Sequence, residues 1–229
     1  MARPLLCLML LVLAAPVEAR RPAPTDVLVR SALGEASVSL SSGCSGALAE
    51  HPQLIATALH CVEKGAQFVD ARLSNGETRR AWVVATDAVA DQAVLFMEED
   101  VKLQPLDVVR RPQIAGTVLF FQGHPRRPRF QEARLDRVGT CRSLPALPNA
   151  LFTSIEGVPG DSGAPLVDGG GRIVGLVHGG ADCHIATPAS TLAAMLDDIL
   201  GPGAAPAVQA VGVVPPPRDL ETPRACRAR

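Results

Sequence analysis

The feature that most constrains the fold is a series of short runs of apolar and β-forming residues separated by turn residues. From about residue 35 onward, nine runs of four to nine residues alternate with spacers such as Ser-Asn-Gly, His-Pro-Arg and Gly-Gly-Gly. The runs occupy residues 36–40, 53–56, 67–73, 81–86, 93–97, 116–122, 130–138, 151–155 and 172–177. This spacing is typical of antiparallel sandwiches and barrels. The sequence therefore predicts an all-β domain.

A single segment, residues 190–200, predicts a helix. Its apolar residues recur at a helical period: Leu192, Met195, Leu196 and Ile199. We expect Ser190 to cap the first turn, and Gly201 and Pro202 to end the helix.

The remaining chain is divided by composition. With 229 residues and 47% hydrophobic content, one domain with one substantial core is expected, and we assign it to residues 35–200. Residues 20–34 begin with an Arg/Pro-rich stretch and are assigned to a leader. Residues 201–229 are rich in Gly, Ala, Pro and Val and predict a disordered tail.

The first 19 residues resemble an export signal. Arg3 precedes an apolar run at residues 5–15, and the small residues Val17 and Ala19 stand at the positions that a signal peptidase inspects. Eleven apolar residues are too few for a membrane anchor, which needs about 20. The sequence thus predicts a secreted protein, extracellular or periplasmic, and its formal net charge of −1 indicates neither nucleic acid nor an anionic membrane as a partner.

Export makes disulfides the expected state of cysteine. Removal of the signal takes Cys7 away and leaves an odd number: Cys44, Cys61, Cys141, Cys183 and Cys226. Cys226 lies in the predicted tail and is the candidate for the unpaired thiol.

A serine flanked by glycines is the first candidate for chemistry. In Gly160-Asp161-Ser162-Gly163, a tight turn can aim the backbone amides of Gly160 and Ser162 at one point, as an oxyanion hole requires. The alternative is an ordinary turn, because Gly, Asp and Ser are common turn residues.

A histidine and an aspartate elsewhere can complete such a site. His60 follows an apolar strand and precedes Cys61, which raises the alternative of a zinc site, but the paired ligands typical of zinc are missing nearby. We therefore predict neither a metal nor any other cofactor. Asp91 directly precedes an apolar run, where a partly buried carboxylate can hold an imidazole tautomer, and Asp87 is its competitor.

Three motifs together resemble the trypsin/chymotrypsin family of serine proteases. Thr57-Ala58-Leu59-His60-Cys61 is similar to Thr-Ala-Ala-His-Cys, Asp91-Gln92-Ala93-Val94-Leu95 to Asp-x-Ala-Leu-Leu, and Gly160-Asp161-Ser162-Gly163 to Gly-Asp-Ser-Gly. The chain order His, Asp, Ser is that of chymotrypsin-like enzymes.

The resemblance extends over residues 36–200 and implies two six-stranded antiparallel β-barrels with a C-terminal helix. It implies a triad in the cleft between the barrels, with His60 and Asp91 from the first and Ser162 from the second. The expected activity is that of a monomeric serine endopeptidase with a peptide or protein substrate. A catalytically silent binding protein on the same fold is the alternative from another class.

The resemblance also assigns a specificity pocket. Glu156, six residues before Ser162, stands at the pocket floor and would favour Arg or Lys. His178, Gly180 and His184 fall in the segments of the pocket wall, where a histidine resembles glutamyl endopeptidases, which favour an acidic residue. The basic preference is adopted because a floor charge is expected to be desolvated. The third interpretation is that the glutamate and a histidine only bond each other and do not set the specificity.

Residues 42–48 resemble the strand Cys-Gly-Gly-Ser-Leu of the family, which implies a disulfide between Cys44 and Cys61. Val158 replaces the cysteine expected before the serine loop, so Cys183 is predicted to pair with Cys141. No Ile-Val-Gly-Gly start is present, which leaves the partner of Asp161 open.

Overall fold

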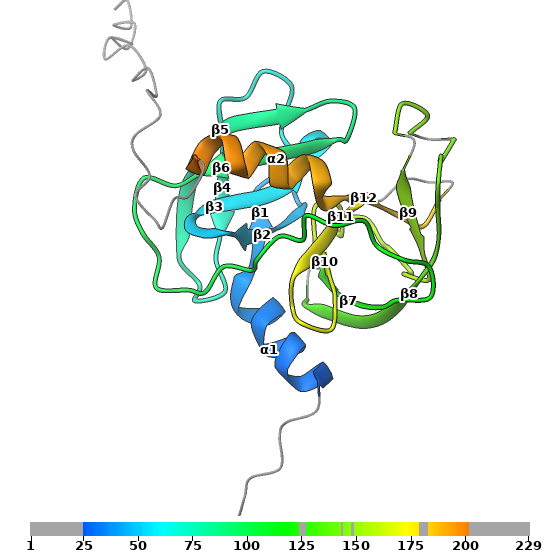
Figure 1. Ribbon diagram of the computed structural model, residues 1–229. Helices are drawn as coiled ribbons and strands as arrows, with labels where there is room; N and C mark the ends of the chain where they lie inside the picture. Colours follow the sequence, from blue (N-terminus) through cyan, green and yellow to red (C-terminus); the bar gives the residue numbers. More distant parts are fainter. Residues whose placement is uncertain (1–24, 124–126, 143, 148, 179–182, 202–229) are drawn as a thin grey trace, which may run out of the picture.

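The computed structural model describes residues 25–201, apart from residues 124–126, 143, 148 and 179–182. Within this part, twelve strands form two closed antiparallel barrels, and a helix lies at each end of the domain (Figure 1). The predicted all-β fold of two six-stranded barrels with a C-terminal helix is confirmed.

The first barrel has the strand order β1-β2-β3-β6-β5-β4. Its strands are β1 (Ser37–Leu40), β2 (Ser45–Ala49), β3 (His51–Ala58), β4 (Phe68–Arg72), β5 (Thr78–Asp87) and β6 (Gln92–Phe96). Alternation is clearest in β4, where Val69 and Ala71 are buried and their neighbours are exposed. Leu48, Leu54, Ile55 and Leu95 are fully buried and belong to the core of this barrel, as expected for a small barrel filled by side chains.

The second barrel has the strand order β10-β11-β12-β9-β8-β7. Its strands are β7 (Val118–Gly123), β8 (Arg129–Gly139), β9 (Ala150–Thr153), β10 (Pro165–Val167), β11 (Ile173–His178) and β12 (Ile185–Pro188). Leu119, Phe121, Leu135 and Leu166 form its buried centre. Three strands were not among the nine predicted runs. Strands β10 and β12 are at most four residues long and each contains a proline. Strand β2 was indicated only by the family resemblance of residues 42–48.

The C-terminal helix α2 (Ala189–Leu200) packs with Leu192, Ala193 and Leu196 buried. The expected end is correct, since the N–H of Gly201 bonds the carbonyl oxygen of Asp197 at 2.8 Å. The expected cap is wrong: α2 begins after Pro188, and no side chain caps its first turn.

A second helix, α1 (Thr25–Ala36), lies in the segment assigned to the leader, so the prediction of a single helix is wrong. Its residues Val29, Leu33 and Ala36 are buried, and Arg30 lies over the ring of Phe130, 4.1 Å from the centroid. A helix of 12 residues is marginal by itself in water, and tertiary packing stabilises it here. In the described part of the chain, no helix has the length and apolarity needed to cross a membrane.

Both predicted disulfides are present, Cys44–Cys61 in the first barrel and Cys141–Cys183 in the second. Hydrogen bonds also join the barrels directly. The side-chain nitrogen of Gln92, at the start of β6, donates to Oγ1 of Thr187 at 2.8 Å and to the carbonyl of Pro188 at 3.0 Å. The barrels therefore meet beside Asp91, the residue before Gln92.

Candidate active site

His60 and Asp91 are held together at two points. His60 lies on the single turn η1 (Leu59–Cys61) that follows β3, and Asp91 ends the connection between β5 and β6. Nδ1 of His60 is 2.6 Å from Oδ2 of Asp91, and the backbone N–H of His60 donates to Oδ1 at 2.9 Å. The backbone N–H of Leu59 also bonds the carbonyl of Asp91 at 3.0 Å. This double contact fixes the imidazole on the carboxylate.

The carboxylate of Asp91 is ionised over the ordinary pH range. Its side chain is only 10% exposed, and burial alone would raise its pKa. Hydrogen bonds from His178 and His60, with the charge of His60, outweigh burial and lower the pKa of Asp91 to about 2. An ionised carboxylate only accepts hydrogen bonds, so Nδ1 of His60 carries a proton and Nε2 is the basic nitrogen of the neutral ring.

Asp87, the competing carboxylate, accepts hydrogen bonds from the backbone of the turn between β5 and β6. Its Oδ1 accepts the backbone N–H groups of Val89 at 2.8 Å and Ala90 at 2.7 Å. Asp87 thus shapes the turn that leads to Asp91, and the structure brings Asp91 to His60, as the sequence indicates.

The serine turn is attached to the first barrel. The carbonyl of Ser162 accepts the N–H of Ser45 at 2.9 Å, and Oγ of Ser45 donates to the carbonyl of Gly160 at 2.8 Å. Sγ of Cys61, the residue next to His60, lies 3.5 Å from the carbonyl oxygen of Ser162. Cys61, the residue after His60, is therefore a neighbour of the serine turn across the barrel interface.

Gly163 allows this close approach. It has a φ of 81°, which side chains disfavour, and a Cβ there would collide with the carbonyl of Ser45, with Oγ1 of Thr57 and with the backbone N of Ala58. The glycine after the serine is required by packing between the barrels.

Asp161, the residue before the serine, is fully buried and bonds a cation from the same barrel. Its Oδ2 lies 3.2 Å from Nη2 of Arg129 and accepts the N–H of Val158 at 2.9 Å. Burial raises the pKa of Asp161, opposed by the bond from Val158 and the charge of Arg129. Nη2 of Arg129 also donates to the carbonyl of Glu156 at 2.6 Å. The partner left open by the sequence is therefore Arg129, which stabilises the loop on both sides of residue 158.

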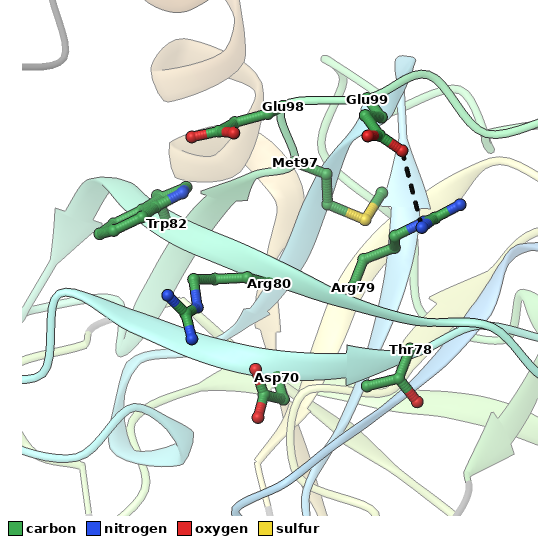
Figure 2. A pocket seen from close by; sticks show the side chains of 8 residues that line it. All are labelled: Asp70, Thr78, Arg79, Arg80, Trp82, Met97, Glu98 and Glu99. Carbon is green, nitrogen blue, oxygen red and sulfur yellow. Dashed lines mark ion pairs between the residues drawn. The ribbon is translucent and has the colours of Figure 1, made fainter. Parts of the chain in front are cut away.

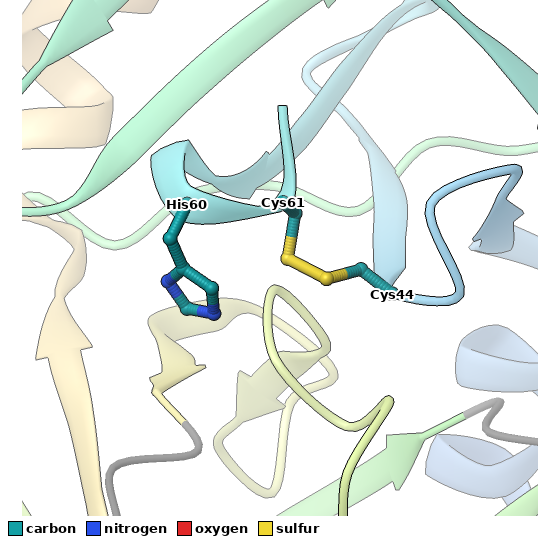
Figure 3. A group of neighbouring side chains, drawn as sticks. All are labelled: Cys44, His60 and Cys61. Atoms are coloured by element: carbon teal, nitrogen blue, oxygen red, sulfur yellow. A yellow bond between two sulfur atoms is a disulfide. The ribbon is translucent and has the colours of Figure 1, made fainter. Parts of the chain in front are cut away.

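The zinc alternative at His60 conflicts with the disulfide. Figure 3 shows Cys44 and Cys61 joined beside His60. Sulfurs in a disulfide supply no thiolate, the form in which cysteine binds metal. The two cysteines therefore fix the position of the turn that carries His60.

A second histidine, His178, contacts Asp91, and this contact was not predicted from the sequence. Nδ1 of His178, the last residue of β11, is 2.7 Å from Oδ2 of Asp91. The rings of His60 and His178 meet edge to face, with centroids 5.0 Å apart. His178 was predicted only for the pocket wall, and nothing in the spacing of residues 91 and 178 indicates this contact.

Two other predicted pocket residues, Glu156 and His184, are exposed to solvent. The side chain of Glu156 is exposed, so the expectation of a desolvated floor charge is wrong. His184 is exposed as well, and its carbonyl accepts the N–H of Thr153 at 2.9 Å. Gly180 lies outside the described residues, as do Cys226 and the predicted signal and tail.

A hollow of about 540 Å³ lies on the first barrel (Figure 2). Its lining is mostly charged: Asp70, Thr78, Arg79, Arg80, Trp82, Met97, Glu98 and Glu99. Arg79 forms ion pairs with Glu77 at 2.6 Å and Glu99 at 3.6 Å, so charges here are paired across the surface. None of the candidate catalytic residues lines it.

Comparison with known proteins agrees with this arrangement. The family model of the trypsin-like peptidase domain matches residues 37–176, more than half of the chain. No curated protein matches the chain. Among solved structures, an HtrA-type protease with a tripeptide superposes with a TM-score of 0.67 at 19% identity. The match covers 76% of this chain and 63% of that protein, and at this identity it shows the fold alone. The barrels, the His60–Asp91 pair and the family match together show that this chain belongs to the trypsin-like peptidase family.

Proposed function

We propose that the protein is a serine endopeptidase that hydrolyses peptide bonds through His60, Asp91 and Ser162. The observation that carries the proposal is the double contact between His60 and Asp91 beside the serine turn. That contact supplies an oriented base whose Nδ1, and not Nε2, is on the carboxylate, and a serine hydroxyl needs such a base to become a nucleophile.

In the proposed reaction, Oγ of Ser162 attacks the carbonyl carbon of the scissile bond while Nε2 of His60 takes the hydroxyl proton. Asp91 stabilises the resulting imidazolium. The backbone amides of Gly160 and Ser162 bind the oxyanion of the tetrahedral intermediate. The intermediate collapses to an acyl-enzyme as His60 protonates the leaving amine, and water then releases the acyl group by the same steps.

Loss of the hydroxyl tests this proposal. Replacing Ser162 by Ala should abolish cleavage of a peptide library while the protein keeps its melting temperature. Retained turnover by Ser162→Ala would refute the assignment of the nucleophile. A folded wild-type protein that cleaves no member of a broad library would instead favour the silent binding protein.

For specificity, we propose cleavage after Arg or Lys. Glu156 supplies a carboxylate at the position that the family resemblance assigns to the pocket floor. Its exposure weakens its attraction for a cation, because water and salt screen exposed charges. Against the glutamyl alternative, a neutral imidazole has one N–H, and in His178 it is the Nδ1–H donated to Asp91. Nε2 of this neutral ring then has no proton to donate to an acidic side chain. Sequencing the products of the library digest tests this choice, and cutting after Glu or Asp would overturn it.

We also propose that the protein is secreted, to the periplasm or the cell exterior, and acts as a monomer. Two disulfides support an oxidising compartment. Fractionation of cells that express the full chain, with N-terminal sequencing of the mature protein, checks for cleavage after residue 19. Size-exclusion chromatography with light scattering checks the monomer.

A further inference from the structure

One oxygen of Asp91 is shared by two imidazoles from different barrels. Oδ2 lies 2.6 Å from Nδ1 of His60 and 2.7 Å from Nδ1 of His178. The side chain of His178 is 13% exposed, compared with 42% for His60. His178 is therefore the buried member of the pair, on the inner side of the carboxylate.

The short distances identify these contacts as hydrogen bonds. The three side chains are also types that bind metals, and their ligand atoms lie within 4.8 Å of one another. Two ligands of one tetrahedral zinc ion, each about 2.1 Å from the metal, stand about 3.4 Å apart. Both observed separations are shorter than this and match charge-assisted hydrogen bonds. Protons, rather than an ion, therefore join His60 and His178 to Asp91.

The carboxylate of Asp91 thus accepts three N–H groups. Oδ1 accepts the backbone N–H of His60, and Oδ2 accepts one Nδ1–H from each histidine. The backbone of Asp91 has a φ of 52°, in the left-handed region that residues other than glycine rarely occupy. The fold thus keeps the backbone of Asp91 in an uncommon conformation, and the three N–H groups hold its carboxylate in place.

We propose that His178 is a positioning residue for the hydrolytic reaction: by donating Nδ1–H to Asp91, it fixes the carboxylate in the orientation that holds His60 ready to accept a proton. His178 acts through Asp91, so this inference rests on the proposed function. The expected consequence is an effect on kcat with little change in KM, because the binding of substrate does not require the base.

A purely structural role is the alternative, since the bond between His178 and Asp91 also connects the barrels. A matched control is available in the next residue pair. Gln92 donates to Oγ1 of Thr187 across the same interface, and Thr187→Val removes that bond without touching Asp91. Gln92 retains its bond to the carbonyl of Pro188 in this variant.

Two replacements of His178 separate the donor from the ring. Asn places a side-chain N–H near the position of Nδ1, whereas Leu has similar bulk and no donor. We expect His178→Asn to keep kcat within about threefold, and His178→Leu to lose about 10- to 100-fold in kcat at similar KM. Thr187→Val should lower the melting temperature and leave kcat nearly unchanged.

The role of His178 is overturned if His178→Leu keeps the wild-type kcat, or if His178→Asn loses as much as His178→Leu. Should the Leu variant fail to fold, His178→Ala takes its place in the same comparison.

A measurement independent of turnover uses protein labelled with ¹⁵N in histidine. The wild type should show two hydrogen-bonded Nδ1–H signals, and His178→Asn should lose one. An active enzyme with a single such signal would overturn the role of His178 alone. An inactive wild type with both signals would refute the proposed function and leave the shared carboxylate intact.

Discussion

Asp91 holds His60 through both of its carboxylate oxygens, one on the imidazole at 2.6 Å and one on the backbone N–H at 2.9 Å. An amide in place of the carboxylate would keep the shape but would present N–H groups or a neutral oxygen to Nδ1. The imidazole would then change tautomer or lose the charge that stabilises its protonated form. We expect Asp91→Asn to lower kcat by about 10⁴-fold. Steady-state kinetics check this, with Asp87→Asn as the matched control that should stay near wild type.

The lowered pKa of Asp91 predicts a dependence of stability on pH. The pKa is about 2 in the folded protein and 3.8 in the reference state. A depressed pKa means that the ionised group stabilises the fold above pH 3.8, and that this contribution is lost as the pH falls towards 2. The contribution is on the order of 2 kcal/mol.

Urea unfolding of the wild type and of Asp91→Asn between pH 6 and pH 2 tests this sign. The difference in unfolding free energy between the two proteins should shrink as the pH falls through that window. A difference that stays constant would show that Asp91 gains nothing from its histidines.

An antiparallel all-β domain could be predicted from the runs, because most strands are long enough to be visible and are bounded by turn residues. The two six-stranded barrels followed from the resemblance to the trypsin/chymotrypsin family. The pairing of His60 with Asp91 could also be predicted, since the sequence around both residues matches known motifs. The catalytic role of Ser162 stays a prediction. Helix α1 could not, because a 12-residue helix next to an Arg/Pro-rich stretch depends on packing against β7.

Two contacts around the candidate site also could not be predicted from the sequence. His178 meets Asp91 across 87 residues, and Arg129 meets Asp161 across 32. The sequence separation of neither pair indicates a contact, because each contact depends on how strands are aligned within or between the barrels. The solvent exposure of Glu156 could not be predicted either. Its position six residues before Ser162 is known from the sequence, but the burial of its side chain depends on the fold.

The pair Arg129–Asp161 predicts that the serine turn depends on an internal cation. Arg129→Gln leaves a buried carboxylate without its charge partner, which should lower the unfolding free energy by roughly 1–3 kcal/mol and reduce kcat. Arg129→Lys should keep part of the unfolding free energy and part of the kcat that Arg129→Gln loses. Exposed Arg127 offers the control Arg127→Gln, measured by the same denaturation and kinetic assays.

If charge is the cause, adding Asp161→Asn to Arg129→Gln should recover stability relative to Arg129→Gln alone. Equal stability of Arg129→Gln and Arg127→Gln would show that the ion pair contributes nothing.

Gly163 predicts a steric limit on the residue after the serine. In Gly163→Ala, the new Cβ meets two backbone groups and Oγ1 of Thr57, so the two barrels must separate locally. We expect a loss of stability of more than about 2 kcal/mol together with a large loss of kcat. Gly157→Ala is the control in the same loop, because a Cβ there meets nothing within 4 Å. Thermal melts that place both variants at the same temperature would contradict this packing argument.

In the proposed reaction, the imidazole of His60 activates the hydroxyl of Ser162. Mass spectrometry of the protein after treatment with an organofluorophosphonate, which reacts with activated serines, tests this activation without a substrate. We expect one adduct, located on Ser162 by peptide mapping, and its loss in a folded His60→Ala variant. No adduct on the wild type, or equal labelling of Ser162 in His60→Ala, would contradict this activation.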